Sequence, residues 1–187
     1  MSQETWSAVD NYFNGLLVPP DVALDAALQA QQDAGLPQIN VAPNQGKLLY
    51  LIARIHGAKS ILEVGTLGGY STIWLARALP AGGRLITLEI DPKHAEVARA
   101  NVARAGLAET VDVRLGSAHD TLPKLFDEGA GPFDLVFIDA DKPSSPVYLE
   151  WALKMTKPGS VIIIDNVVRN GGVSATNSSD ANVLGVR

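Results

Sequence analysis

The stretch "LEVGTLGGYS" at residues 62–71 decides the fold class of this chain. It begins as a short apolar strand, turns over three glycines and continues as the start of a helix. Glycine allows the backbone conformations that a tight turn requires. We therefore expect a strand at 60–64 and a helix at about 70–79.

The same alternation of short apolar strands and helices continues along the chain. Further strands are expected at 84–90, 110–115, 134–139 and 160–165, and further helices at about 92–105, 117–128 and 145–156. Apolar strands that alternate with helices are typical of a parallel sheet covered on both faces. The run from Val161 to Ile164 accordingly predicts a strand buried on both faces. We therefore predict an α/β fold with a mostly parallel sheet and helices on both of its faces.

Helical segments precede this alternation. They are expected at about 4–16, from Asp21 to Gly35, and from 45 to a stop at Gly57. The first of them carries three aromatic residues, Trp6, Tyr12 and Phe13. These aromatics form a lid over a site on one interpretation, and core or dimer contacts on the other.

Length and composition bound the class of protein. A chain of 187 residues is long enough for one domain with a full core. We predict a single domain over 1–187, in which the helices of 1–45 form a lid or dimer contacts and 46–187 forms the core. Hydrophobic residues make up 47% and charged residues 19%, a globular balance. The net charge of -5 and the scattered basic residues argue against a nucleic-acid partner.

The absence of cysteine, of a signal peptide and of a membrane span bears on the cellular compartment. The chain has no cysteine, which excludes disulfides and thiolate metal sites and is compatible with a reducing compartment. Its first residues do not read as a signal peptide, and no apolar run approaches the roughly 20 residues that a membrane span needs. We expect a cytoplasmic protein with no membrane partner.

The unusual residues gather where the predicted strands end. In a parallel sheet every carboxyl end lies on one edge, and ligands bind there near the switch in strand order. The residues that fall at this edge are Glu63, Val64, Gly65, Glu89, Ser117, Ala118, Asp139, Asp165 and Asn166. This edge is the predicted ligand site.

The glycine turn differs from that of a dinucleotide-binding protein. A dinucleotide fingerprint has the spacing G-x-G-x-x-G, whereas Thr66 and Leu67 stand where the second glycine should come. Glu63 would also repel a pyrophosphate. At the end of the next strand, the Glu89 carboxylate can accept both hydroxyls of a ribose. Each feature alone has a plain structural explanation, a tight turn or a solvated strand end, but together they favour a nucleoside ligand with a cationic end.

Two acidic strand ends suggest a cation site. Asp139 and Asp165 are 26 residues apart, the length of one strand–helix–strand unit, so their strands are expected to be neighbours about 4.8 Å apart. Two carboxylates with the Asn166 amide oxygen form a hard oxygen site that suits Mg²⁺, with Mn²⁺ or Ca²⁺ as alternatives. The alternative is that Asp165 and Asn166 only cap a turn.

The stretch 41–173 resembles the cation-dependent O-methyltransferases that use S-adenosylmethionine, the group that contains catechol and caffeoyl-CoA O-methyltransferases. Five motifs carry the resemblance in order and with matching spacing: "LEVGTLGGYS", "LEID", "GSAHDTLPKL", "FIDADK" and "VIIIDNVVRNGGV". It implies a Rossmann-like methyltransferase fold, a homodimer, and methyl transfer to a hydroxyl of a vicinal aromatic diol or its thioester. The cofactor contacts that it implies are Glu63, Gly65, Thr66 and Ser71 at the methionine end, Glu89 at the ribose, Ala118 and His119 at the adenine, and also Val41, Asp141 and Tyr148.

The resemblance also implies the catalytic residues, Lys142 and Asp139. Lys142 matches the family's catalytic lysine, which takes the remaining proton of the acceptor while the cation lowers the pKa of a hydroxyl. A solvated surface lysine is the commoner role of a lysine after a strand. Pro143 departs from the family pattern and would stiffen the loop that carries Lys142.

A second departure lies at the C-terminus. Family members continue through a further helix and a closing antiparallel pair of strands, whereas this sequence ends at Arg187. We expect those closing strands to be missing and one sheet edge to be open. The alternatives are an S-adenosylmethionine-binding domain without catalysis, a nicotinamide-dependent oxidoreductase and a metal-independent methyltransferase.

Overall fold

The structure, a computed structural model, describes residues 3–187 and is built on a five-stranded parallel sheet. Met1 and Ser2, which the predicted N-terminal region includes, lie outside the described residues. The strands are β1 (Ser60–Val64), β2 (Arg84–Glu89), β3 (Val111–Leu115), β4 (Phe133–Ile138) and β5 (Thr156–Ile164). Their order in the sheet is β3-β2-β1-β4-β5, and all four pairs are parallel. The predicted α/β class is confirmed.

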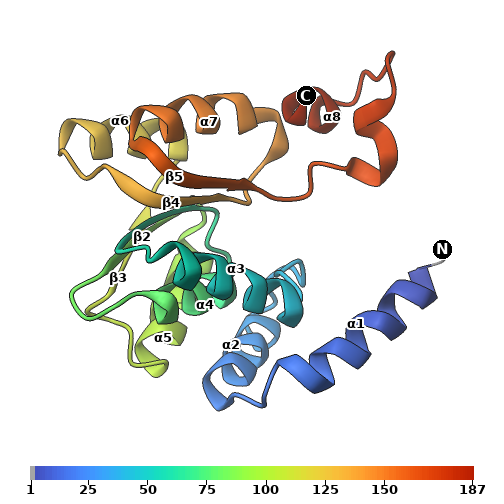
Figure 1. Cartoon of the computed structure of the whole chain (residues 1–187), viewed down its shortest axis with the longest axis vertical. Coiled ribbons are helices and arrows are strands. Elements are labelled where there is room, and N and C mark those ends of the chain that lie inside the picture. Colours follow the sequence, from blue (N-terminus) through green and yellow to red (C-terminus); the bar gives the residue numbers. More distant parts are fainter. Residues whose placement is uncertain (1–2) are drawn as a thin grey trace.

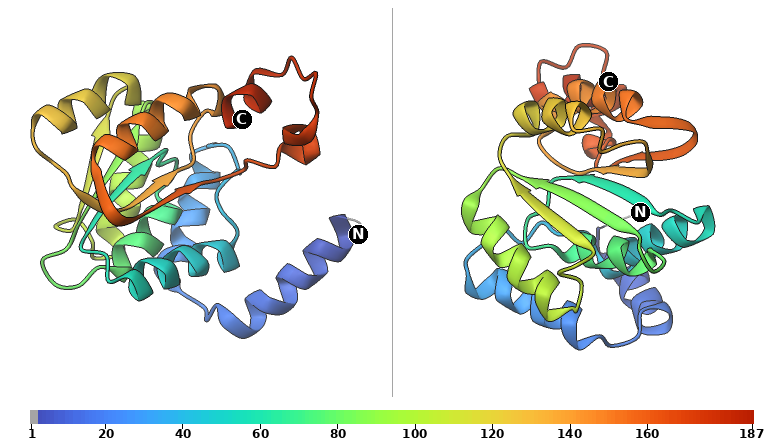
Figure 2. Two further views of the ribbon diagram at one scale, coloured as in Figure 1. Left: turned by 45° about the horizontal axis from the view of Figure 1, so that its top comes forward. Right: turned by 90° about the vertical axis from the view of Figure 1, so that its left-hand side faces the viewer.

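Helices cover both faces of this sheet, as Figures 1 and 2 show. The helices are α1 (Gln3–Leu17), α2 (Val22–Asp33), α3 (Pro43–His56), α4 (Tyr70–Ala78), α5 (Pro92–Arg104), α6 (Ala118–Asp127), α7 (Ser145–Lys154) and α8 (Ala181–Val186), with short 3₁₀ turns η1 (Lys142–Ser144) and η2 (Arg169–Ser174). Helices α3, α4 and α5 lie on one face, and α6 and α7 lie on the other. The observed helices begin and end within two residues of the positions expected between the strands.

Local sequence explains where several helices begin. The Asp91 carboxylate accepts backbone N–H groups of Lys93 and His94 at 2.8 and 3.3 Å, and Pro92 occupies the first turn of α5. Asp21 caps α2 in the same way and also pairs with Arg77 of α4. Side-chain caps satisfy N–H groups that have no partner inside the helix. The helix starts predicted at Asp21 and Asp91 are confirmed.

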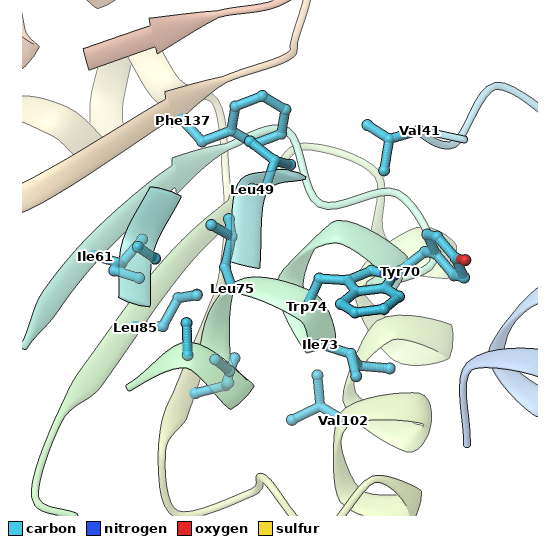
Figure 3. Packing of buried hydrophobic residues seen from close by; sticks show 14 of the residues in the cluster. Val41, Leu49, Ile61, Tyr70, Ile73, Trp74, Leu75, Leu85, Val102 and Phe137 are labelled. Carbon is cyan, nitrogen blue, oxygen red and sulfur yellow. The ribbon is translucent and has the colours of Figure 1, made fainter. Parts of the chain in front are cut away.

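The alternation of side chains along each strand produces two apolar layers. On one face, residues such as Ile61, Leu85 and Phe137 pack with α3, α4 and α5, and Figure 3 shows this cluster from close by. On the other face, Leu62 and Val136 pack with α6 and α7. Burying each large apolar side chain stabilises the fold by about 1.5–3 kcal/mol. These two layers hold the sheet rigid and place the carboxyl ends of its strands.

Strand β5 differs from expectation in its burial. Val161 to Ile164 are only partly buried, because β5 is one of the two edge strands and has β4 as its one neighbour in the sheet. The prediction of a strand buried on both faces was therefore wrong. Within residues 3–187, β5 pairs with β4 alone.

Helix α1 stands apart from the rest of the chain and contacts mainly α3 (Figures 1 and 2). Its aromatic side chains are exposed, with 49% of Trp6, 65% of Tyr12 and 44% of Phe13 accessible. The core interpretation of these aromatics is therefore wrong for the chain as described. Within residues 3–187, no helix has the length and apolar character to cross a membrane.

Candidate active site

A cavity of about 770 Å³ runs along the carboxyl ends of the strands. Residues that follow β1, β2, β3, β4 and β5 all contribute to its wall, so it extends along the whole sheet edge. Of the residues predicted to form the site, those that line the cavity are Val41, Gly65, Thr66, Ser71, Glu89, Ala118, His119, Asp139, Asp141, Lys142, Tyr148 and Asn166. Glu63 and Asp165 are not part of the lining. The sheet topology thus brings nearly all of the predicted residues to one cavity.

The glycine turn after β1 is held from two neighbouring strands. The Gly65 N–H donates to the Leu88 carbonyl oxygen at 3.0 Å, and a Cβ at Gly65 would collide with the Asp139 carbonyl oxygen. Gly65 also has a φ of +100°, which L side chains rarely adopt. Glycine is required here because the turn passes directly against β4.

Glu89 is buried at the end of β2 and binds the same turn. Its carboxylate accepts the N–H groups of Thr66, Leu67 and Asp91 at 3.3, 2.8 and 2.9 Å, and the His94 ring nitrogen Nδ1 lies 3.6 Å away. An ionised carboxylate has about four acceptor positions. Three backbone donors therefore leave room for about one further donor, fewer than the two hydroxyls expected from the sequence.

Glu63 lies behind the cavity wall. The side chain is fully buried, and its carboxylate accepts the hydroxyls of Ser71, Thr72 and Thr87 at 2.7, 2.5 and 2.7 Å. Burial raises the pKa of Glu63 to about 7, against the effect of the three hydroxyl donors. Ser71, which does line the cavity, stands between Glu63 and the space that a ligand can enter. The structure thus places Glu63 where it orients Ser71, whereas the sequence led us to expect it at the methionine end itself.

Lys142 and Asp139 form a partly buried ion pair at the end of β4. Lys142 Nζ donates to Asp139 Oδ1 at 2.8 Å, and Lys142 is only 7% exposed. Burial raises the pKa of Asp139, the Lys142 ammonium lowers it, and the charge of Asp165 raises it again. The solvated-surface interpretation of Lys142 was therefore wrong. Pro143 lies inside η1 and does not prevent Lys142 from reaching Asp139.

The acidic strand ends are neighbours, as the sequence predicted. Ile138 pairs with Ile164, and the Asp165 N–H donates to the Ile138 carbonyl oxygen at 3.0 Å, so Asp139 and Asp165 occupy equivalent positions on adjacent strands. Asp165 Oδ1 accepts the N–H of Asn166 at 2.6 Å. Within residues 3–187 there is no group of three or more His, Cys, Asp or Glu side chains placed to hold a metal ion. A cation here would instead need the two carboxylates and the Asn166 amide, a donor set that is chemically suited to Mg²⁺.

Aromatic and polar residues of η1 and α7 form another part of the wall. Tyr148 donates from its hydroxyl to Asp141 Oδ1 at 2.5 Å, and its ring lies 5.6 Å from the His119 ring. Burial and this bond to Asp141 raise the pKa of Tyr148 to about 12. The hydrogen bonds from Ser144 and Tyr148 outweigh burial and lower the pKa of Asp141. Tyr148 stays protonated and Asp141 charged at neutral pH, which fixes this wall.

Several residues at the site were not among those predicted from the sequence. Gln45 donates from Nε2 to Asp165 Oδ2 at 2.6 Å, across 120 residues of sequence. Gln45 does not itself line the cavity, but the lining residues that were missed include Gln31, Asn40, His94, Arg169 and Asn182. None of them follows a strand directly, so the strand-end signal could not find them. Arg169 does fall within the "VIIIDNVVRNGGV" motif, which was the one available signal.

The comparisons with known proteins agree with this geometry. The family described as O-methyltransferase matches residues 22–186. A catechol O-methyltransferase of Niastella koreensis is 54% identical over 187 residues, which are 100% of this chain and 85% of that protein. An O-methyltransferase from Bacillus cereus, solved in complex with SAH, matches with a TM-score of 0.97 at 54% identity. The match covers 98% of this chain and 84% of the Bacillus cereus chain.

A third similar protein has been solved with SAM in place of SAH. An O-methyltransferase from Streptomyces achromogenes, solved in complex with SAM, matches with a TM-score of 0.95 at 51% identity. The match covers 100% of this chain and 84% of the Streptomyces achromogenes chain. The match of fold and sequence over nearly the whole chain confirms the Rossmann-like methyltransferase fold that the five motifs implied. The chain belongs to the O-methyltransferase family and is an enzyme of that family.

Proposed function

We propose that this enzyme transfers a methyl group from S-adenosylmethionine to one hydroxyl of a vicinal aromatic diol, with the help of a divalent cation. The observation that carries the proposal is one continuous cavity that joins the glycine turn and Glu89 to the Lys142–Asp139 pair. The solved relatives hold SAH or SAM, and a curated relative is a catechol O-methyltransferase.

The cofactor would lie along β1 and β2. Gly65, Thr66, Ser71 and Val41 would surround its methionine end, and Glu89 would accept a ribose hydroxyl with its remaining acceptor position. Ala118 and His119 would border the adenine, and Asp141 and Tyr148 would complete the wall. Glu63 would act through Ser71, which it orients by a hydrogen bond.

The cation would be held by Asp139, Asp165 and Asn166. Support comes from the position of the two carboxylates on adjacent strand ends, where the charge of Asp165 raises the pKa of Asp139. When bound, a divalent cation such as Mg²⁺ supplies positive charge that lowers the pKa of an acceptor hydroxyl. Asp139 would then have two charged neighbours, because Lys142 also contacts it.

Lys142 would take the proton of the reacting hydroxyl. Its Nζ atom lies at the cavity wall, 2.8 Å from Asp139, and its burial keeps it in place. The acceptor oxygen forms a bond to the methyl carbon, the carbon–sulfur bond of the sulfonium breaks, and the hydroxyl proton passes to the Lys142 amine, which must first lose its own ammonium proton to solvent. The cofactor leaves as the neutral thioether.

Assembly and location complete the proposal. The exposed aromatic face of α1, with Trp6, Tyr12 and Phe13, would be covered in a homodimer, the second of the two roles expected for it. The cytoplasm would suit a chain without cysteine. Size-exclusion chromatography with light scattering tests the dimer directly.

The central experiment is mass detection of methyl transfer to a panel of catechols and their thioesters, with and without chelator. We expect the product to gain one methyl group only when S-adenosylmethionine is present, and turnover to fall on chelation. Cofactor binding without turnover of any acceptor would instead indicate a binding domain, and preferential binding of NAD would indicate an oxidoreductase.

A further inference from the structure

The end of the cavity beside β5 contains a cation that the proposed function does not use. Arg169, at the start of η2, lines the cavity together with Asn166 and Asn182. It is half-buried. All three residues belong to the segment that follows β5, the edge strand on the opposite side of the sheet from β2 and β3.

Among the described residues, Arg169 has no anionic partner in direct contact. Of the lysines and arginines that line the cavity, Lys142 is held by Asp139, whereas Arg169 makes no salt bridge or side-chain hydrogen bond with any residue in 3–187. The pKa of Asp180 is lowered, mainly by hydrogen bonds from Asn182 and to a lesser extent by the charge of Arg169. A half-buried guanidinium without a partner is unfavourable, and a carboxylate fits its planar fork of donors.

The backbone conformation around Arg169 also indicates a ligand site. Asn166, Arg169 and Asn170 have φ values of 54°, 48° and 53°, in the left-handed region that residues other than glycine seldom adopt. Arginine is an uncommon residue at such a position. Backbone of this kind persists only where the surrounding structure holds it, and it is concentrated at ligand sites.

The position of Arg169 favours the acceptor over the cofactor as its ligand. The glycine turn follows β1, whereas Arg169 follows β5, and β4 lies between them. Two strand spacings amount to about 10 Å. The proposed functional groups on the same segment are those of Asp165 and Asn166 at the end of β5, where the reacting diol would bind.

We propose that Arg169 is a specificity-determining residue that selects aromatic diols bearing a carboxylate. This inference rests on the proposed function, because it concerns the acceptor of the same methyl transfer. The guanidinium would bind the carboxylate on the side of the ring away from the two hydroxyls. It would contribute equally to substrate and transition-state binding, so its effect belongs in KM and not in kcat.

The test compares matched acceptors in matched variants. The acceptors are 3,4-dihydroxybenzoate, 3,4-dihydroxyphenylacetate and 3,4-dihydroxyphenylpropanoate, each beside its neutral methyl ester. The variants are wild type, Arg169→Gln and Arg54→Gln; the last removes the same charge from an exposed position on α3. Steady-state methyl transfer gives kcat and KM for every pair, and calorimetry gives the affinity for SAH.

We expect wild type and Arg54→Gln to prefer at least one acid over its ester in kcat/KM. In Arg169→Gln that preference should fall roughly 10- to 100-fold through KM, the scale of a charge-assisted hydrogen bond. Turnover of the esters and affinity for SAH should stay unchanged. Three results would each overturn the role of Arg169. They are an unaltered preference for the acid in Arg169→Gln, no preference in wild type, and an equal loss in Arg169→Gln of kcat/KM for acids, of kcat/KM for esters and of affinity for SAH. Turnover of the esters by wild type keeps the proposed function standing in all of these cases, whereas turnover of no diol at all would remove it.

Discussion

Gln45 on α3 and Asp165 after β5 are joined by a 2.6 Å hydrogen bond from Nε2 to Oδ2, although 120 residues separate them in sequence. The bond occupies one carboxylate oxygen of Asp165, and the Asn166 N–H occupies the other. Gln45 therefore orients one of the two acids that would hold the cation. Partners of this kind around metal ligands typically contribute 10- to 100-fold to metal affinity.

The first prediction concerns this bond. Gln45→Leu should weaken Mg²⁺ or Mn²⁺ binding roughly 10- to 100-fold, because Asp165 loses the donor that fixes its orientation. Titration calorimetry with the metal alone measures this, and the affinity for SAH should not change. Gln29→Leu is the control, because Gln29 Nε2 donates in the same way to an acid, Asp33, that does not line the cavity. Equal metal affinity in Gln45→Leu and wild type would show that Asp165 needs no outside support.

The second prediction concerns Asp165 itself. Asp165→Ala, or exhaustive chelation of the wild type, should reduce turnover of a catechol at least about 100-fold, because the charge that activates the hydroxyl is lost. Adding Mg²⁺ should restore the chelated wild type and not the variant. Turnover that survives both treatments, with a normal melting temperature, would mean that the strand-end acids only cap a turn.

The third prediction concerns Glu89. Glu89→Ala should weaken S-adenosylmethionine binding by roughly 1.5–3 kcal/mol, the scale of charge-assisted hydrogen bonds. Because Glu89 also accepts two N–H groups of the glycine turn, the melting temperature without cofactor should fall as well. Calorimetry and thermal melts are compared with Glu96→Ala, an exposed acid on α5. A loss of stability with unaltered affinity would assign Glu89 to the turn alone.

The fourth prediction concerns Lys142. Lys142→Ala should lose roughly 10²–10⁴-fold in single-turnover methyl transfer if Lys142 accepts the hydroxyl proton, while cofactor affinity stays nearly intact. Lys142→Arg should recover little, because a guanidinium does not give up its proton to act as a base. Measurements across pH compare both variants with the wild type. Full activity in the arginine variant would leave Lys142 with an orienting role.

The fifth prediction follows from the raised pKa of Glu63. In the folded protein this pKa is about 7, against 4.5 for a glutamate in the unfolded chain, so the folded state binds a proton there that the unfolded state releases. The resulting stabilisation is fully present below pH 4.5 and is lost as pH rises through 7. The free energy of unfolding of wild type should fall by about 3 kcal/mol over this window relative to Glu63→Gln, which cannot ionise. Urea titrations at pH 4.5, 6 and 8 measure this difference, and parallel curves for the two proteins would contradict it.

Local pattern was sufficient for the elements and for the strand-end residues. The spacing of apolar residues and the positions of the glycines located the strand, turn and helix at 62–71, because these elements depend on residues close in sequence. The parallel arrangement then put Glu89, Asp139 and Asp165 on one edge without any coordinates, since every parallel strand ends on the same side.

Only the tertiary structure decided which groups touch. It showed that Glu63 lies behind Ser71, that Lys142 is buried against Asp139, and that β5 is an edge strand with half-buried side chains. It also brought Gln45 to Asp165 and Arg169 to the wall of the cavity. Sequence by itself determined the order of the elements because hydrophobic period and turn chemistry are local; packing across the sheet determined burial, pairing and charge, because these depend on neighbours that are distant along the chain.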